Sequence, residues 1–152
     1  MMTCPVRALH SDDIDAVARL WRESTLSIGI EGDFVPDLAE YRDRLEVEWK
    51  RAWRVHVACD ESGIAGFLAF EPEASWLRQH FVAPARKGEG SGRLLLDVAK
   101  REMPEGFWLR TSVANGAARR FYETQGLRNI GEFPHEHWPV TIVRYQWSRE
   151  RL

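Results

Sequence analysis

A glycine-rich segment in the middle of the chain has the residue types of an anion-binding turn. It reads Lys87-Gly88-Glu89-Gly90-Ser91-Gly92-Arg93 and lies between a strand-like and a helix-like segment. Glycine removes side chains where a backbone must approach a ligand closely. The following helix would direct its unpaired N–H groups and the positive end of its dipole at the turn, so a phosphate is the expected occupant. Lys87 and Arg93 add positive charge at the same end.

The spacing of this segment excludes two common phosphate-binding motifs. A Walker A loop closes with Gly-Lys-Ser/Thr, which is absent here. A dinucleotide fingerprint reads G-x-G-x-x-G, but Arg93 stands at the position of the last glycine. Taken alone, the segment is also compatible with a purely structural turn.

The segment and its flanks resemble the GNAT superfamily of acyl-CoA N-acyltransferases. The turn of that family reads Arg/Gln-x-x-Gly-x-Gly/Ala, and Lys87-x-x-Gly90-x-Gly92 matches it with a lysine at the first position. A lysine attracts a diphosphate with less directional bonding than an arginine. Val82-Ala83-Pro84 before the turn and Leu94-Leu95-Leu96 after it are also similar to the family pattern.

A second block further along the chain strengthens the resemblance. Asn115-x-x-Ala118-x-x-Phe121-Tyr122-x-x-x-Gly126-Leu127 is similar to the family's Asn-x-x-Ala-x-x-Phe-Tyr-x-x-x-Gly-Phe. The firm resemblance covers residues 76–133, and the order of predicted elements extends it over the chain.

The resemblance implies an N-acetyltransferase that moves an acetyl group from acetyl-CoA to a primary amine of a small molecule or peptide. It implies direct attack of the amine in a ternary complex, without a metal. The pantetheine arm would lie between the strand ending at Val82 and the strand ending near Ser112, with a backbone N–H available to polarise the thioester carbonyl. The residues expected to bind the cofactor are Phe81, Val82, Ala83, Lys87, Gly88, Glu89, Gly90, Ser91, Gly92, Arg93, Asn115, Ala118, Phe121 and Tyr122.

Tyr122 matches the position at which the family often has its general acid, which would protonate the departing CoA thiolate. The alternative is that Tyr122 only completes the apolar stripe of its helix. Asn115 has two compatible roles, as a helix N-cap and as a hydrogen-bonding partner of the pantetheine arm.

The general base and the acceptor site are less defined by the sequence. An ordinary amine arrives protonated at pH 7, so a base is needed. His80 and Glu71 are candidates, and relay through water needs neither. Glu31 and Asp33 lie in a loop that borders the acceptor site in this family, where they would attract a cationic amine. A solvated loop is the alternative for both.

The motif His135-Glu136-His137 has metal-binding residue types. On a strand, the i and i+2 spacing would place both rings on one face. No third ligand is evident, so we expect no metal. The segment 133–138 is instead expected to form a loop over the acceptor pocket. Cys4 and Cys59 lack metal-like spacing and are expected to be free thiols.

Hydrophobic periodicity predicts the order β-α-α-β-β-β-α-β-α-β-β. Ser11 and Asp37 are expected to cap the first two helices, with a loop from Thr25 to Pro36 between them. A strand–helix–strand stretch over 75–112 implies one parallel pair. We therefore expect an α/β fold whose central sheet is mixed and mostly antiparallel, with a splayed parallel strand pair. The other expected strands cover 6–9, 54–59, 64–70, 127–133 and 140–147, and the last two helices run from about Leu94 to Met103 and from Ala114 to Tyr122.

The 152 residues suit a single domain spanning 1–152, and the net charge of −2 offers no general surface for nucleic acid. No stretch approaches the length of a membrane helix, and we expect a cytoplasmic protein. Homodimerisation is common in the family, and the C-terminal strands offer a surface for it. Three alternatives stay open: a non-catalytic acyl-CoA-binding module, a transferase using another acyl-CoA, and a nucleotide-binding protein using the same turn.

Overall fold

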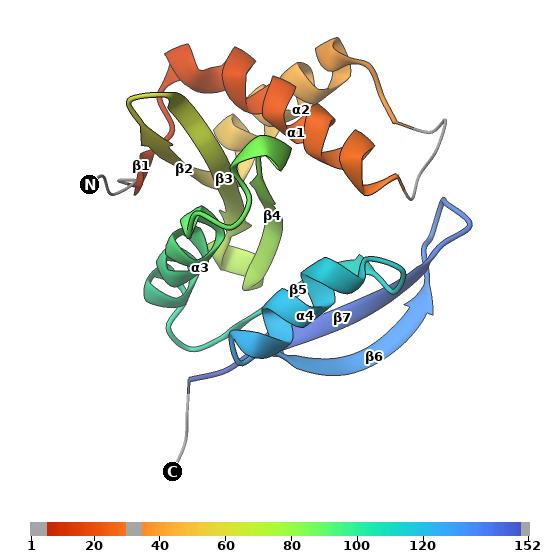
Figure 1. Ribbon diagram of the computed structural model, residues 1–152. Helices are drawn as coiled ribbons and strands as arrows, with labels where there is room; N and C mark the ends of the chain where they lie inside the picture. The colour runs from red at the N-terminus through yellow and green to blue at the C-terminus, as the bar shows by residue number, and fades with distance from the viewer. Residues whose placement is uncertain (1–5, 30–34, 150–152) are drawn as a thin grey trace.

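The computed structural model describes residues 6–29 and 35–149 (Figure 1). The order of helices and strands confirms the predicted order. The elements are β1 (Val6–Ala8), α1 (Ile14–Ile28), α2 (Leu38–Arg51), β2 (Arg54–Asp60), β3 (Gly63–Glu71), β4 (Trp76–Val82), α3 (Ser91–Glu102), β5 (Phe107–Ser112), α4 (Gly116–Thr124), β6 (Arg128–Pro134) and β7 (Thr141–Trp147).

The seven strands form one sheet in the order β1-β2-β3-β4-β5-β7-β6. Every neighbouring pair is antiparallel except β4 and β5. Those two strands share a single registered pair, Trp76 with Trp108, and diverge beyond it. The mixed sheet with a splayed parallel pair is therefore confirmed.

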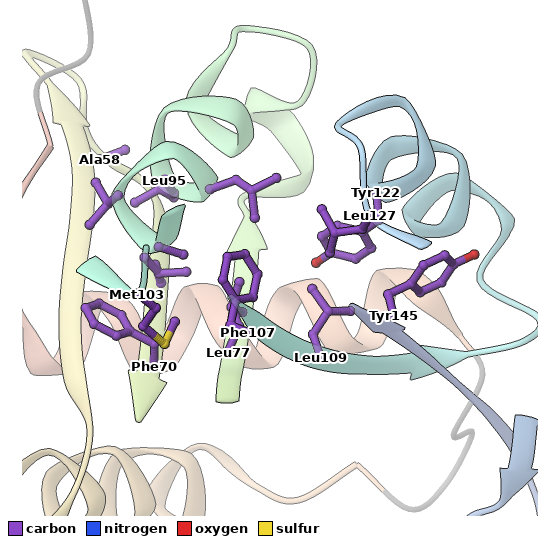
Figure 2. Packing of buried hydrophobic residues seen from close by; sticks show 14 of the residues in the cluster. Ala58, Phe70, Leu77, Leu95, Met103, Phe107, Leu109, Tyr122, Leu127 and Tyr145 are labelled. Atoms are coloured by element: carbon purple, nitrogen blue, oxygen red, sulfur yellow. The ribbon is translucent and has the colours of Figure 1, made fainter. Parts of the chain in front are cut away.

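The helices cover both faces of the sheet (Figure 1). On one face, α1 and α2 pack on β2 and β3 around Trp21, Leu45 and Phe67. On the other face, α3 and α4 enclose a second core that includes Leu95, Leu109 and other side chains shown in Figure 2. Within the described residues, no helix is both long and apolar enough to cross a membrane.

A bulge in β4 changes the face to which its side chains point. Ala69 of β3 pairs with Gln79 and Phe70 pairs with Leu77, so Arg78 is an extra residue in β4. Leu77 and His80, three positions apart, consequently both face α3 and α4. Phe81 faces the α1 side, where it stacks on Phe67 with 5.9 Å between ring centroids.

The structure corrects several predicted ends. His10 rather than Ser11 caps the first helical segment, because its side chain accepts from the Asp12 N–H and Ser11–Asp13 form a 3₁₀ turn before α1. The helix α1 continues to Ile28 and ends at Gly29 in the left-handed region, so the loop begins later than Thr25. Asp37 caps α2 as predicted, in a capping box with Glu40.

Two further boundaries differ near the predicted site. Ser91 and Gly92 belong to the first turn of α3, so the loop ends at Gly90 rather than at Gly92. The last helix begins at Gly116, which leaves Ala114 in the preceding turn. In both places the chain enters its helix at a residue that the apolar stripe alone does not mark.

Candidate active site

The turn before α3 has the backbone of an anion-binding turn. Gly88 has φ 87° and Gly90 has φ 95°, a region that favours glycine. Gly90 is the N-cap of α3 and supplies no side-chain oxygen to the first-turn N–H groups. A Cβ added at either glycine would meet no atom within 4 Å, so the turn is open to a ligand. These features fit a diphosphate bound at the start of α3.

Arg86, which is not among the predicted site residues, stabilises this turn. Its Nε donates to Glu89 Oε1 at 2.9 Å, and its Nη2 donates to Asp60 at the end of β2. The first contact neutralises the only carboxylate inside the turn. The i and i+3 spacing of Arg86 and Glu89 was the available signal, whereas the link to Asp60 joins residues 26 positions apart. Lys87, Glu89 and Arg93 are all exposed at this turn.

The pairing of β4 with β3 determines which backbone N–H and C=O groups of β4 point to the side where β4 and β5 diverge. The Ala83 N–H donates to the Ala65 carbonyl at 2.8 Å, and Phe81 pairs with Phe67 two positions earlier. Since antiparallel pairs alternate, Phe81 and Ala83 direct their backbone polar groups at β3. His80 and Val82 therefore direct theirs at the divergence, where Ser24 Oγ donates to the Val82 carbonyl at 3.3 Å. Of the three predicted edge residues, only Val82 faces that way.

His80 and Tyr122 are brought into direct contact. The Tyr122 hydroxyl lies 2.9 Å from His80 Nδ1, and His80 Nε2 lies 2.8 Å from the Gly92 carbonyl in the first turn of α3. A carbonyl only accepts, so Nε2 carries the proton and donates to Gly92. Nδ1 is then an acceptor, and the Tyr122 hydroxyl donates to it.

Burial keeps both groups neutral. It lowers the pKa of His80 to about 4, with the bond to Gly92 opposing this in part. It also raises the pKa of the Tyr122 phenol. Tyr122 therefore retains its proton across the pH range in which acetyl transfer would be measured.

Gly92 is the point where α3, α4 and β4 meet. A Cβ at Gly92 would lie 3.5 Å from Val82 Cγ2 and 3.7 Å from the Phe121 ring. Asn115 caps α4, because its Oδ1 accepts from the Ala118 N–H at 3.2 Å. The residues of the two family-like blocks thus lie around one end of the diverging strands.

The other predicted site residues lie elsewhere or outside the described part. Glu71 forms an ion pair with Arg78 at 3.6 Å, at the end of β4 away from the glycine turn. Glu31 and Asp33 lie outside the described residues.

The segment His135–His137 lies in the turn after β6, which agrees with the predicted loop except that β6 extends to Pro134. His135 Nδ1 accepts from the N–H groups of His137 and Trp138, so it serves to close this turn. No cluster of three metal-ligating side chains occurs in residues 6–29 and 35–149. Cys59 carries a free thiol.

Solved acetyltransferases share this fold along nearly all of the chain. The protein yncA of Salmonella typhimurium, solved with its cofactor acetyl-CoA, is 17% identical with a TM-score of 0.77, over 99% of this chain and 96% of that one. A protein of Corynebacterium glutamicum, described as histone acetyltransferase HPA2 and related acetyltransferase, is 15% identical with a TM-score of 0.79, over 99% of both chains. The ribosomal-protein-alanine N-acetyltransferase of Brucella melitensis is 19% identical with a TM-score of 0.73, over 95% and 99%.

At these low identities the solved structures show only the fold, whereas a family comparison shows the family. No curated protein matches the sequence. The sequence profile of the acetyltransferase (GNAT) domain matches residues 51–128, which include β4, the glycine turn, α3, β5 and α4. The chain therefore belongs to the GNAT acetyltransferase family, as an acyl-CoA-dependent N-acetyltransferase that uses acetyl-CoA.

Proposed function

We propose that the enzyme transfers the acetyl group of acetyl-CoA to a primary amine of a small molecule or peptide, by direct attack in a ternary complex. The observation that carries this proposal is the arrangement around Gly92. There the glycine turn, the diverging edge of β4 and the Tyr122 hydroxyl lie within one continuous set of contacts.

The glycine turn, β4 and Tyr122 have separate proposed roles. The turn at Gly88 and Gly90 and the start of α3 hold the diphosphate, with Lys87 and Arg93 nearby. The backbone groups of β4 that face the divergence pair with the pantetheine arm. Acetyl-CoA supplies the acetyl group as an activated thioester. Tyr122 turns its hydroxyl proton from His80 Nδ1 to the departing thiolate, and a proton relayed through water from the amine restores the phenol.

His80 acts in this proposal as a positioning residue. Both of its ring nitrogens are bonded and its pKa is about 4, so it is a poor acceptor for an amine proton near pH 7. Its contacts instead fix the orientation of the Tyr122 hydroxyl relative to the first turn of α3. Glu71 is held by Arg78. We therefore assign removal of the amine proton to water.

Replacing His80 by leucine should lower kcat about tenfold with little change in the KM for acetyl-CoA, because the Tyr122 hydroxyl loses its acceptor. His80→Asn keeps a short side-chain oxygen and should recover part of this loss.

The folded-state pKa of His80 lies below its ordinary 6.5, so the neutral form is favoured and the wild type should lose stability as pH falls from 6.5 toward 4. Urea unfolding at several pH values should show that the free energy of unfolding depends less on pH in both variants than in the wild type. A variant that is less stable at neutral pH yet unchanged in kcat would mean that His80 only fills space.

The proposed function is tested by acetyl transfer to a panel of primary amines. Free-thiol release should depend on the amine, and mass spectrometry should find the N-acetylated product. CoA should raise the Tm, while ATP and NAD should leave it unchanged. Stabilisation by CoA without transfer to any amine would favour a non-catalytic acyl-CoA-binding module instead.

A further inference from the structure

Three arginines gather on the sheet face opposite Tyr122. Phe107 and Leu109 of β5 belong to the core under α3 and α4, so the intervening Trp108 and the next residue Arg110 point to the other face. Arg144 of β7 is directly opposite Arg110 in the register and shares that face. Arg78, the bulge residue of β4, joins them through Trp76. We call Arg78, Arg110 and Arg144 the arginine face.

Indole rings hold these arginines where β4 and β5 begin to diverge. Trp76 and Trp108 form the one registered pair of the two strands and stack with 4.1 Å between ring centroids. The Arg78 guanidinium lies 3.5 Å from the Trp76 centroid, and that of Arg144 lies 3.9 Å from the Trp108 centroid. Stacking on a ring leaves the N–H groups at the edge of a guanidinium available for an anion.

The arginine face carries more positive than negative charge. Glu71 pairs with Arg78 at 3.6 Å and Glu136 pairs with Arg110 at 3.3 Å. Within residues 6–29 and 35–149, no carboxylate pairs with Arg144, and its Nε is buried without a hydrogen-bond acceptor. Like charges directly opposite each other in a sheet are destabilising, and a buried unpaired donor adds to the cost. An anionic ligand at the edges of the two guanidinium groups would offset the repulsion between the directly opposed Arg110 and Arg144.

The charge balance selects the class of anion. Three arginines against two glutamates leave one positive charge, which matches a monoanionic carboxylate better than a phosphate dianion. A carboxylate is also planar and fits the donor fork of a guanidinium. The rings of Trp76, Trp108 and Phe133, the last lying 5.8 Å from the Arg110 guanidinium, provide an apolar wall beside it.

We propose that the acceptor is an amine bearing a carboxylate, of the amino-acid class, and that Arg144 with Arg110 binds its carboxylate on the face opposite Tyr122. This inference rests on the proposed function. It lets the two substrates approach the diverging strands from opposite faces, with acetyl-CoA on the side of α3 and α4. The carboxylate would accept from the terminal N–H groups of Arg144 and Arg110 and lie between the two opposed positive charges.

The test compares each amino acid with its uncharged amide at saturating acetyl-CoA, for α-amino acids, β-alanine and γ-aminobutyrate, with phosphoethanolamine as the dianionic comparison. The wild type should show at least about a tenfold higher kcat/KM for the best acid than for its amide, the size expected for one charge-assisted hydrogen bond. Arg144→Gln should remove this preference, and Arg144→Lys should restore part of it. The matched control is Arg54→Gln, an exposed arginine of the same sheet that pairs with Glu102.

The outcomes separate this inference from the proposed function. Equal rates for acids and amides, a preference for phosphoethanolamine, or a preference retained in Arg144→Gln would overturn the carboxylate site while leaving amine acetylation intact. If no amine is acetylated, the proposed function fails, and the carboxylate site is tested by binding of the amino acids alone. A Tm increase with the amino acids that is lost in Arg144→Gln would then support it, and its absence in the wild type would overturn it.

Discussion

Tyr122→Phe should lower kcat about 100- to 1000-fold while leaving the KM for acetyl-CoA nearly unchanged, the size expected for loss of a general acid. In the proposed mechanism the general acid is the phenol that lies beside His80 Nδ1, and phenylalanine keeps the packing of the ring but removes the hydroxyl. Burial raises the pKa of Tyr122, so wild-type kcat should not fall where an exposed phenol would begin to ionise near pH 10. Steady-state kinetics from pH 6 to pH 10 measure both effects.

Tyr145→Phe is the matched control for this prediction. Tyr145 is fully buried in the same core, and its ring centroid lies 6.1 Å from that of Tyr122. Its hydroxyl contacts Arg119 and Glu123 instead of His80, and Figure 2 shows the two hydroxyls pointing in opposite directions. The control should lose some stability and keep its kcat. An unchanged kcat in Tyr122→Phe would show that the tyrosine only completes the apolar stripe of α4.

Gly90→Asp should raise the KM for acetyl-CoA about 100-fold above that of Gly90→Asn, with kcat at saturation largely kept. Asp and Asn have nearly the same shape, and both tolerate the left-handed region better than other side chains, so the comparison isolates the added charge at φ 95°. A carboxylate within about 6 Å of a phosphate, at an effective dielectric constant of about 20, costs on the order of 3 kcal/mol. Titration of acetyl-CoA against each variant measures this difference.

The salt dependence provides a second check on the role of the turn. The gap between the two variants should narrow as ionic strength rises, because exposed charges are screened. Equal KM values for Gly90→Asp and Gly90→Asn would mean that no phosphate lies near Gly90. That result would remove the physical basis for placing acetyl-CoA at the start of α3.

Local sequence patterns were sufficient for the order of elements and for the turn. Alternating glycines followed by an apolar helical stripe identify the turn at Gly88 and Gly90, because the signal lies within a few consecutive residues. The caps at Asp37 and Asn115 were predicted for the same reason, since a cap contacts residues only three positions away. The ends of helices were less well predicted, as at Ser11 and Thr25, because apolar periodicity fades at helix termini.

Local sequence patterns were not sufficient to predict which face of the sheet each side chain of β4 points to. Strict alternation puts the side chains of His80 and Phe81 on opposite faces of the sheet but does not show which of them faces α3 and α4. The bulge at Arg78 determines it, and a bulge depends on pairing with β3 that periodicity does not encode. His80 and Glu71 were equal candidates for the general base in the sequence. The fold places one between Tyr122 and Gly92 and the other against Arg78.

The sequence by itself determined the family, the mixed sheet and the position of the glycine turn proposed to receive the phosphates, because these depend on short-range spacing and helix chemistry. Only the tertiary structure joined His80 to Tyr122 across 42 positions and set Arg110 directly opposite Arg144. Those contacts follow from strand order and register, which are fixed by the packing of the whole sheet rather than by any local segment.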